Sequence, residues 1–234
     1  ITCGSWKDIW LNEGFATYLS GIVVESFDGA QSFNDWKQNR INSITSQPGG
    51  SVYIVDNDTT SSRIFNGRLS YSKGALVLHM LRKELGDDVF YQSLQDYLVD
   101  PDFSYGYAKS AEFIDTIEET SQMDLTEFFD DWLYGEGYPS YSIEWSQPSE
   151  NLARIVINQT QSHESVDFFE SKVNIKLNGS NGESLTVTLD NTYNGQEFFQ
   201  TVLFDVSDVE FDPYYDIISK NNDAASLTPA IPCA

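Results

Sequence analysis

The chain changes its hydrophobic period once, close to Gly137-Tyr138-Pro139, and this change limits the folds available to it. Before this point apolar residues recur mostly at helical spacing, and after it they alternate with a period of two. Separate helical and strand-rich stretches are typical of α+β proteins. The sequence therefore predicts an α+β protein in two segregated parts, an all-α part over residues 1–139 and a small antiparallel β-sandwich over 140–217. The polar stretch 218–234 is expected to be a tail or linker.

Helices are expected over residues 6–27, 31–44, 69–85, 89–98, 108–120 and 125–133, with a polar loop over 47–65. The first helix has an apolar stripe formed by Leu11, Phe15, Leu19 and Ile22. The helix expected over residues 69–85 has no broad polar face, so it should be buried. Strands are expected over residues 141–145, 152–158, 168–177, 184–189 and 197–204, with a short one over 209–211.

Charge and hydropathy exclude several classes of partner. The chain has 13 Lys and Arg against 36 Asp and Glu, a net charge of −23, spread over both parts. Nucleic acids and anionic membrane surfaces need clustered basic residues, so neither is an expected partner. No apolar run approaches the length of about 20 residues that a membrane span requires. A solvated acidic surface is the simplest interpretation of the charge.

One carboxylate in the first helix is the main candidate for chemistry. Glu13 lies in Trp10-Leu11-Asn12-Glu13-Gly14-Phe15-Ala16, turned away from the apolar stripe and on the same face as Trp6, Trp10 and Thr17. A carboxylate between tryptophans is costly to bury unless it is paired or bound to metal. Spacing alone also allows an ordinary surface glutamate.

The sequence around Glu13 resembles a motif of a known family. Residues 1–16, ITCGSWKDIWLNEGFA, closely resemble the segment that follows the zinc motif of the aminopeptidase N family of gluzincin metallopeptidases. That family's pattern is HExxH, eighteen residues, then Glu; the two histidines and the last Glu bind zinc. The resemblance implies that Glu13 is a metal ligand for zinc, with Asp8 and Asn12 as candidates to orient it through hydrogen bonds. It also implies that the HExxH helix belongs to an N-terminal part of the same chain, its second histidine seven residues before Ile1.

A second sequence motif supports the resemblance to the same family. Leu69-Ser70-Tyr71-Ser72-Lys73-Gly74 resembles the family's Tyr-x-Lys-Gly word, in which the tyrosine hydrogen-bonds to the oxyanion formed from the peptide carbonyl. The resemblance implies this catalytic role for Tyr71. Gly74 is interpreted as allowing close helix packing, and Lys73 as pairing with a carboxylate. Residues 128–139 resemble the end of the family's catalytic domain, so residues 1–139 would be its helical C-terminal half.

Two histidines remain. His79, on the apolar third helix, is interpreted as a core or interface residue, and His163 as a loop residue without a ligand role.

These observations predict part of a zinc aminopeptidase that removes N-terminal residues from peptide substrates, with the isolated chain inactive. The alternative is a non-catalytic module that binds protein or carbohydrate on a metallopeptidase-like scaffold, and a third, weaker possibility is an unrelated acidic helical protein. The polar composition, poor in Lys and Arg, is typical of an exported protein, periplasmic or extracellular. Cys3 and Cys233 could pair only if the tail folds back.

Overall fold

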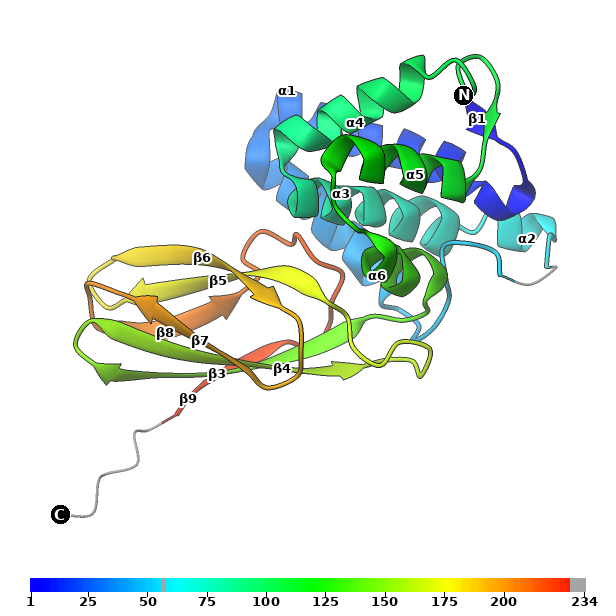
Figure 1. The fold of residues 1–234 in the computed structure, drawn as a ribbon. Coiled ribbons are helices and arrows are strands. Elements are labelled where there is room, and N and C mark those ends of the chain that lie inside the picture. Colours follow the sequence, from blue (N-terminus) through cyan, green and yellow to red (C-terminus); the bar gives the residue numbers. More distant parts are fainter. Residues whose placement is uncertain (56–57, 228–234) are drawn as a thin grey trace.

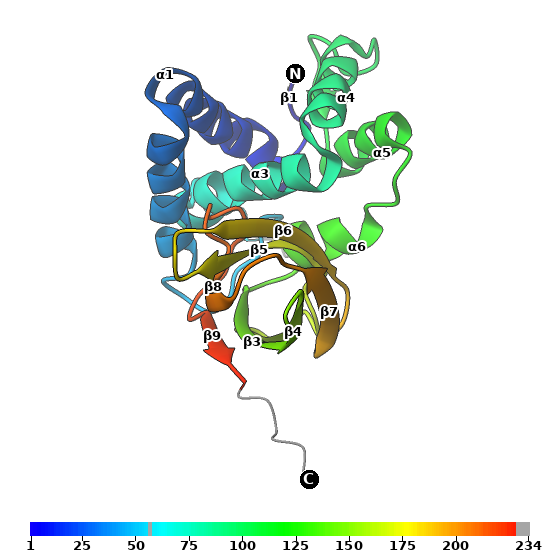
Figure 2. The same cartoon turned by 90° about the vertical axis from the view of Figure 1, so that its left-hand side faces the viewer.

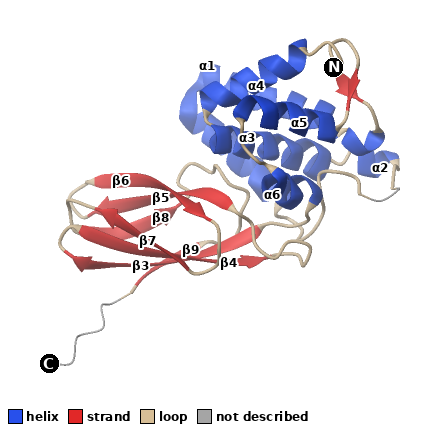
Figure 3. Cartoon of the chain, in the orientation of Figure 1, coloured by secondary structure: helices blue, strands red, loops and turns tan. Residues whose placement is uncertain are grey.

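The computed structural model describes residues 1–55 and 58–227, and its helices and strands occupy separate parts of the molecule (Figures 1 and 3). The helical elements are η1 (Trp6–Asp8), α1 (Trp10–Ile44), α2 (Ser61–Ile64), η2 (Gly67–Lys73), α3 (Gly74–Leu85), α4 (Asp87–Val99), α5 (Ser110–Ser121), α6 (Thr126–Phe129) and η3 (Asp130–Tyr134). Both η2 and η3 are π-helical turns. Of the helices in the described part, none combines the length and apolarity needed to cross a membrane.

The helical part was predicted to be all-α, but it also contains one short pair of strands. Strand β1 (Thr2–Cys3) pairs in parallel with β2 (Tyr107–Ala108), tying the first residues to the segment before α5. Neither two-residue strand is long enough to show a period, so the sequence pattern could not reveal this pair.

The two helices predicted over 6–27 and 31–44 form the single long element α1, bent at Gly29. Gly29 has a φ of 85°, a left-handed conformation that glycine adopts without a steric cost. The bend turns the second half of α1 toward the β part (Figure 2). The backbone of Gly29 is not helical, so α1 consists of two helices joined at a kink, as the sequence predicted.

The buried face of α1 differs from the apolar stripe of the sequence. The structure buries Trp10, Leu11, Gly14, Tyr18 and Gly21, whereas the side chain of Leu19 is 54% exposed. Two of the buried positions are glycines, where neighbouring groups approach the helix backbone closely. A stripe drawn only through large apolar residues misses such a face. In contrast, residues 74–81 of α3 are all buried, as predicted.

The β part contains β3 (Pro139–Ser149), β4 (Leu152–Gln161), β5 (Ser171–Gly179), β6 (Ser184–Asn191), β7 (Gln196–Thr201), β8 (Val206–Phe211) and β9 (Asp223–Ser226). They form one sheet in the order β7-β4-β3-β9 and another in the order β6-β5-β8. The sheets face each other (Figure 2), and the ring of Tyr141 stacks on that of Phe211 with centroids 4.5 Å apart. All pairs are antiparallel except β3 with β9.

Strand β9 lies inside the stretch that was predicted to be a tail or linker. Its residues, Asp-Ala-Ala-Ser, carry no hydrophobic alternation and are all exposed. The strand is held by backbone pairing along the free edge of β3, from Ser142–Asp223 to Trp145–Ser226. Open sheet edges accept such strands through main-chain groups alone, which explains why the side-chain pattern gave no sign of it.

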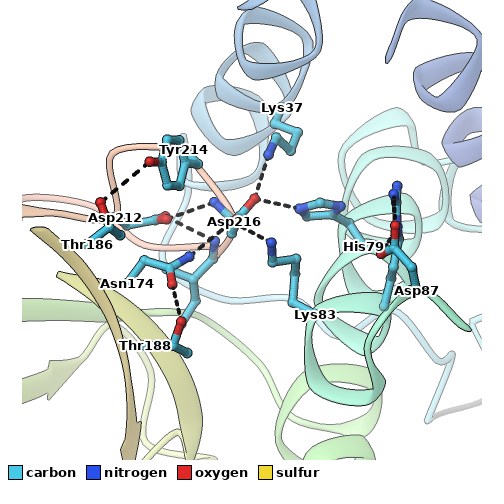
Figure 4. A network of polar contacts seen from close by, with 12 residues as sticks. Lys37, His79, Lys83, Asp87, Asn174, Thr186, Thr188, Asp212, Tyr214 and Asp216 are labelled. Atoms are coloured by element: carbon cyan, nitrogen blue, oxygen red, sulfur yellow. Dashed lines mark hydrogen bonds and ion pairs between the residues drawn. The ribbon is translucent and has the colours of Figure 1, made fainter. Parts of the chain in front are cut away.

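A buried carboxylate joins the two parts (Figure 4). Asp216, in the loop after β8, lies between Lys37 of α1, and His79 and Lys83 of α3. Its Oδ1 is 2.5 Å from Lys37 Nζ and 2.9 Å from His79 Nε2, and its Oδ2 is 3.1 Å from Lys83 Nζ. The side-chain amide of Asn174 in β5 donates to Oδ2 as well. We call these five residues the Asp216 junction.

The charges of the junction are set by burial and by mutual contact. Burial alone would raise the pKa of Asp216, but the hydrogen bond from His79 and the charge of Lys37 hold it well below its usual range. Burial lowers the pKa of His79 to about 4, against the opposing effect of its hydrogen bond to Asp216. The imidazole is therefore neutral at pH 7, and His79 lies at an interface, as the sequence suggested.

Substituting Asp216→Asn should destabilise the protein by about 3–5 kcal/mol, because it leaves Lys37 buried without a counter-charge. A second substitution, Lys37→Met, should recover part of this loss by removing the stranded ammonium. Urea unfolding followed by circular dichroism measures both effects. The exposed Asp208→Asn in β8 is the matched control and should change stability by no more than about 0.5 kcal/mol. An Asp216→Asn protein as stable as the wild type would contradict the structural importance of the junction.

Candidate active site

Glu13 lies in the first turn of α1 and is half-buried at the edge of an open cleft of about 600 Å³. The cleft is also lined by residues of the first nine positions and by Asn12, Phe65 and Tyr107. Trp6, predicted to share a face with Glu13, is half-exposed there, and its ring meets that of Phe65 edge to face. Within the described residues Glu13 forms no ion pair, so its carboxylate remains available to a ligand.

The structure brings Tyr71 to Glu13. Tyr71 lies in η2, directly before α3, and is half-buried. Burial raises the pKa of the Tyr71 phenol, and the nearby carboxylate of Glu13 raises it further. The phenol is therefore protonated at neutral pH and can donate a hydrogen bond. Two residues 58 positions apart in sequence thus share one site.

A glycine-to-glycine approach sets this geometry. Gly14 follows Glu13 in α1, and Gly74 follows Lys73 at the start of α3. A Cβ atom on Gly14 would lie 3.0 Å from the carbonyl carbon of Gly74, and one on Gly74 would lie 3.3 Å from the Cα of Gly14. Bare backbones at this point let α1 and α3 approach closely, as the sequence predicted for Gly74. The two glycines therefore decide how far Glu13 lies from Tyr71.

The turn that bears Tyr71 is fixed at both ends. At its start, the side chain of Asn66 accepts hydrogen bonds from the backbone N–H groups of Arg68 and Leu69, each at 3.1 Å. At its end, Lys73 is only 1% exposed, and its Nζ donates to the carbonyl oxygens of Gly50 at 3.2 Å and Gly135 at 3.1 Å. Lys73 was predicted to meet a carboxylate; its hydrogen bonds in the structure go instead to these two backbone carbonyls.

Asp8 and Asn12 form hydrogen bonds with segments near Glu13. The buried carboxylate of Asp8 accepts from the backbone N–H and the hydroxyl of Ser110, at 2.9 and 2.7 Å, and so holds the start of α5. Asn12 accepts from the backbone N–H of Cys3 and donates to the hydroxyl of Thr2. Asp8 thus holds the start of α5, and Asn12 holds the first residues of the chain, near Glu13. A direct role of either residue in orienting the Glu13 carboxylate stays a prediction.

The other potential ligands do not join Glu13 in this chain. His79 belongs to the Asp216 junction, and His163 lies in a loop beside Ser165, with its Nδ1 3.1 Å from that hydroxyl. Across the part of the chain that the structure describes, no group of three or more His, Cys, Asp or Glu side chains is arranged to hold a metal ion. Cys3 is a free thiol, and its proposed partner Cys233 lies outside the described residues.

The sequence did not identify two contributors to this site. Phe65 was assigned to a loop, yet it forms part of the cleft beside Glu13, and Tyr107 reaches the cleft through the β1–β2 pair. The length of the 47–65 loop gave no indication of where it returns. Only the structure shows that both aromatic residues flank a carboxylate that lies far from them in sequence.

Substituting Gly14→Ala should destabilise the chain by about 1–3 kcal/mol, because the new methyl group would press on the backbone of Gly74. The matched control is Gly67→Ala at the start of η2, where a Cβ has no neighbour within 4 Å and the φ is ordinary. That control should leave stability unchanged or raise it slightly. Thermal unfolding of the two variants checks the difference, and equal effects would show that the close approach is not needed.

The pH dependence of stability should reveal the buried amine of Lys73. Burial, reinforced by the charge of Arg68, lowers the pKa of Lys73 to about 7 from an unfolded value near 10.5. Between these values the unfolded chain binds more protons than the folded one, so the free energy of unfolding rises with pH. The expected gain is up to about 1.4 kcal/mol per pH unit. Chemical denaturation at pH 7.5–9.5 should show this slope in the wild type and lose it in Lys73→Met; equal slopes would contradict the assignment.

Comparison with known proteins supports the family resemblance. Residues 1–132 match the peptidase family M1 domain. Glutamyl aminopeptidase from Sus scrofa is 28% identical over 199 residues, covering 82% of this chain and 21% of the pig protein. Alanine/arginine aminopeptidase from Saccharomyces cerevisiae is 30% identical over 150 residues, and aminopeptidase N from Lactococcus lactis is 27% identical over 151; each alignment covers 62% of this chain.

The fold has a known counterpart as well. The crystal structure of Legionella pneumophila aminopeptidase A in complex with aspartic acid superposes on 94% of this chain with a TM-score of 0.71, at 16% identity, and the match covers 25% of that protein. The chain spans only about a fifth of the length of the curated relatives named above. Because the M1 domain match covers more than half of its residues, this chain belongs to peptidase family M1.

Proposed function

We propose that this chain is part of a zinc-dependent aminopeptidase and contributes a metal ligand, Glu13, and an oxyanion-stabilising phenol, Tyr71. The observation that carries the proposal is the proximity of these two side chains next to the Gly14–Gly74 approach, with Glu13 at the edge of an open cleft. The aminopeptidase names of the relatives support the same reaction class.

Glu13 suits a metal by chemistry and by setting. A half-buried carboxylate facing a cleft, with no ion pair in the described part of the chain, is a donor that Zn²⁺ accepts. A catalytic zinc site usually takes three protein ligands, so two more are required. In the proposal these are two histidines from chain that precedes residue 1. Bound zinc would supply an activated water and polarise the scissile carbonyl.

Tyr71 has the properties of a donor to developing negative charge. Its raised pKa keeps the hydroxyl protonated, and its rigid ring is held by a turn fixed at Asn66 and Lys73. In the structure the hydroxyl interacts with the nearby carboxylate of Glu13; in the reaction it would donate to the oxyanion instead. A donor that is aimed before the charge appears costs no reorganisation during the reaction.

An apolar groove supports the participation of further chain from the same protein. The groove has a volume of about 220 Å³, lies next to the first residues, and is lined mainly by apolar side chains, among them Leu11, Phe15, Leu19, Leu94 and Leu98. Apolar surface of this kind is normally covered. Because the relatives are several times longer than this chain, we propose that a preceding part of the same protein packs here, behind the helix face that bears Glu13.

In the longer parent protein, Tyr71→Phe should lower kcat for an aminoacyl-anilide by about 10²- to 10³-fold with little change in KM, since the phenol acts only in the transition state. Glu13→Ala should lose both bound zinc and hydrolysis. The exposed Tyr193→Phe and Glu150→Gln are the controls and should resemble the wild type. Full activity in both Glu13→Ala and Tyr71→Phe would contradict the roles proposed for these residues, whereas a parent protein without hydrolytic activity would favour the alternative, a binding module on a metallopeptidase-like scaffold.

The isolated chain should neither hydrolyse the anilide nor hold stoichiometric zinc at Glu13, because one carboxylate is too few ligands for a tight site. Equilibrium dialysis with zinc followed by metal analysis measures this directly. Zinc bound one to one, and lost in Glu13→Ala, would overturn the division of the site between two parts of the protein.

A further inference from the structure

Three cations converge on one short loop beside Tyr71. The chain has only 13 basic residues, yet three of them donate hydrogen bonds to backbone carbonyls in the segment 49–53. The contacts are Arg63 with the carbonyls of Ser51 and Tyr53, Arg68 with that of Gly49, and Lys73 with that of Gly50. Glu136 also contacts the loop and accepts a hydrogen bond from the backbone N–H of Gly50 at 2.6 Å.

The loop is pressed against the π-helical turn η2. Gly50 has a φ of 104°, and a Cβ there would lie 2.8 Å from Arg68 Nη2 and 2.9 Å from the methyl groups of Leu69. The second bond of Lys73, to Gly135, reaches the end of η3 at the entrance to the β part. Lys73 thus joins three segments that are distant in sequence, and two of them carry no catalytic candidate.

Keeping an amine in this place is unfavourable for stability. Lys73 is fully buried and its hydrogen-bond partners are neutral carbonyls, so a methionine of similar length would avoid the cost of burying a charge. The location of the amine suggests another purpose. It ends the turn that carries Tyr71 two residues earlier, and the following residue, Gly74, makes the close approach to Gly14.

We propose that Lys73 is a positioning residue for Tyr71: its buried amine fastens η2 to Gly50 and Gly135 and so fixes where the Tyr71 hydroxyl points. The proposal rests on the function proposed above for Tyr71. Asn66 fixes the beginning of the turn, the amine fixes its end, and the hydroxyl is held between them. Loss of the amine leaves the helix α3 in place but frees the turn to rotate.

The first test uses the parent protein and a double-mutant cycle. Lys73→Met should lower kcat at least tenfold with KM within about twofold, because the phenol acts in the transition state. In a Tyr71→Phe background the same substitution should cause no further loss, since residues that act as one unit are not additive. Lys176→Met on the surface of β5 is the control and should leave kcat unchanged. An equal loss in both backgrounds, or no loss in either, would overturn the proposal.

The second test needs no metal and no activity. The ring resonances of Tyr71 in this chain, assigned by their disappearance in Tyr71→Phe, should shift in Lys73→Met and not in Lys176→Met. If Lys73→Met does not fold, Glu136→Ala serves instead, because it loosens Gly50 while keeping the amine, and a smaller shift is expected. Unchanged resonances in a folded variant would refute the positioning role. A parent protein that hydrolyses no anilide would refute the proposed function, while the resonances still decide the role of Lys73.

Discussion

The architecture of the site depends on the contact between Gly14 and Gly74. Each glycine directly follows a residue of interest, Glu13 in α1 and Lys73 at the end of η2. The place where the helices come closest is therefore also where the candidate side chains Glu13 and Tyr71 meet. Any side chain larger than hydrogen would push α1 and α3 apart and increase the separation of Glu13 and Tyr71. The chemistry of the cleft is therefore a consequence of backbone packing, and the side chains take their positions from it.

A second constraint acts at the other end of the same two helices. Lys37 lies in the second half of α1, beyond the bend at Gly29, and His79 lies in α3; both meet Asp216. One carboxylate from the β part therefore clamps the helix pair whose other end carries the site. Removing one member of a buried charge network is costly, so the junction couples the two parts through all of its members. The β part thereby supports the helices that carry Glu13 and Tyr71.

The sequence was informative where local pattern and local structure coincide. The two family motifs contain Glu13 and Tyr71, which the structure brings close together. The change of hydrophobic period coincides with the start of β3 at Pro139, and Gly74 lies at a close helix contact, as expected. Predictions from the sequence failed where contacts between distant segments determine the structure. The buried face of α1 contains glycines that no hydrophobic stripe includes, and β9 pairs with β3 through its backbone and one hydrogen bond from the Ser142 hydroxyl to Asp223. Asp216 looks like any aspartate of a polar loop until three basic residues from two helices are seen around it.

The placement of the basic residues makes the surface even less suited to nucleic acids and anionic membranes than the net charge of −23 indicates. Several of the 13 basic residues are directed inward: Lys37 to the Asp216 junction, and Arg63, Arg68 and Lys73 to carbonyls of the 49–53 loop. Basic groups that satisfy internal acceptors are withdrawn from the surface, while most of the 36 acidic residues remain solvated. Burying basic residues leaves the net charge unchanged, but it makes the surface more acidic than the total count indicates. It follows that removing Lys37 or Lys73 alters the total charge by only one unit, yet disturbs the interior far more than removing an exposed acidic residue would.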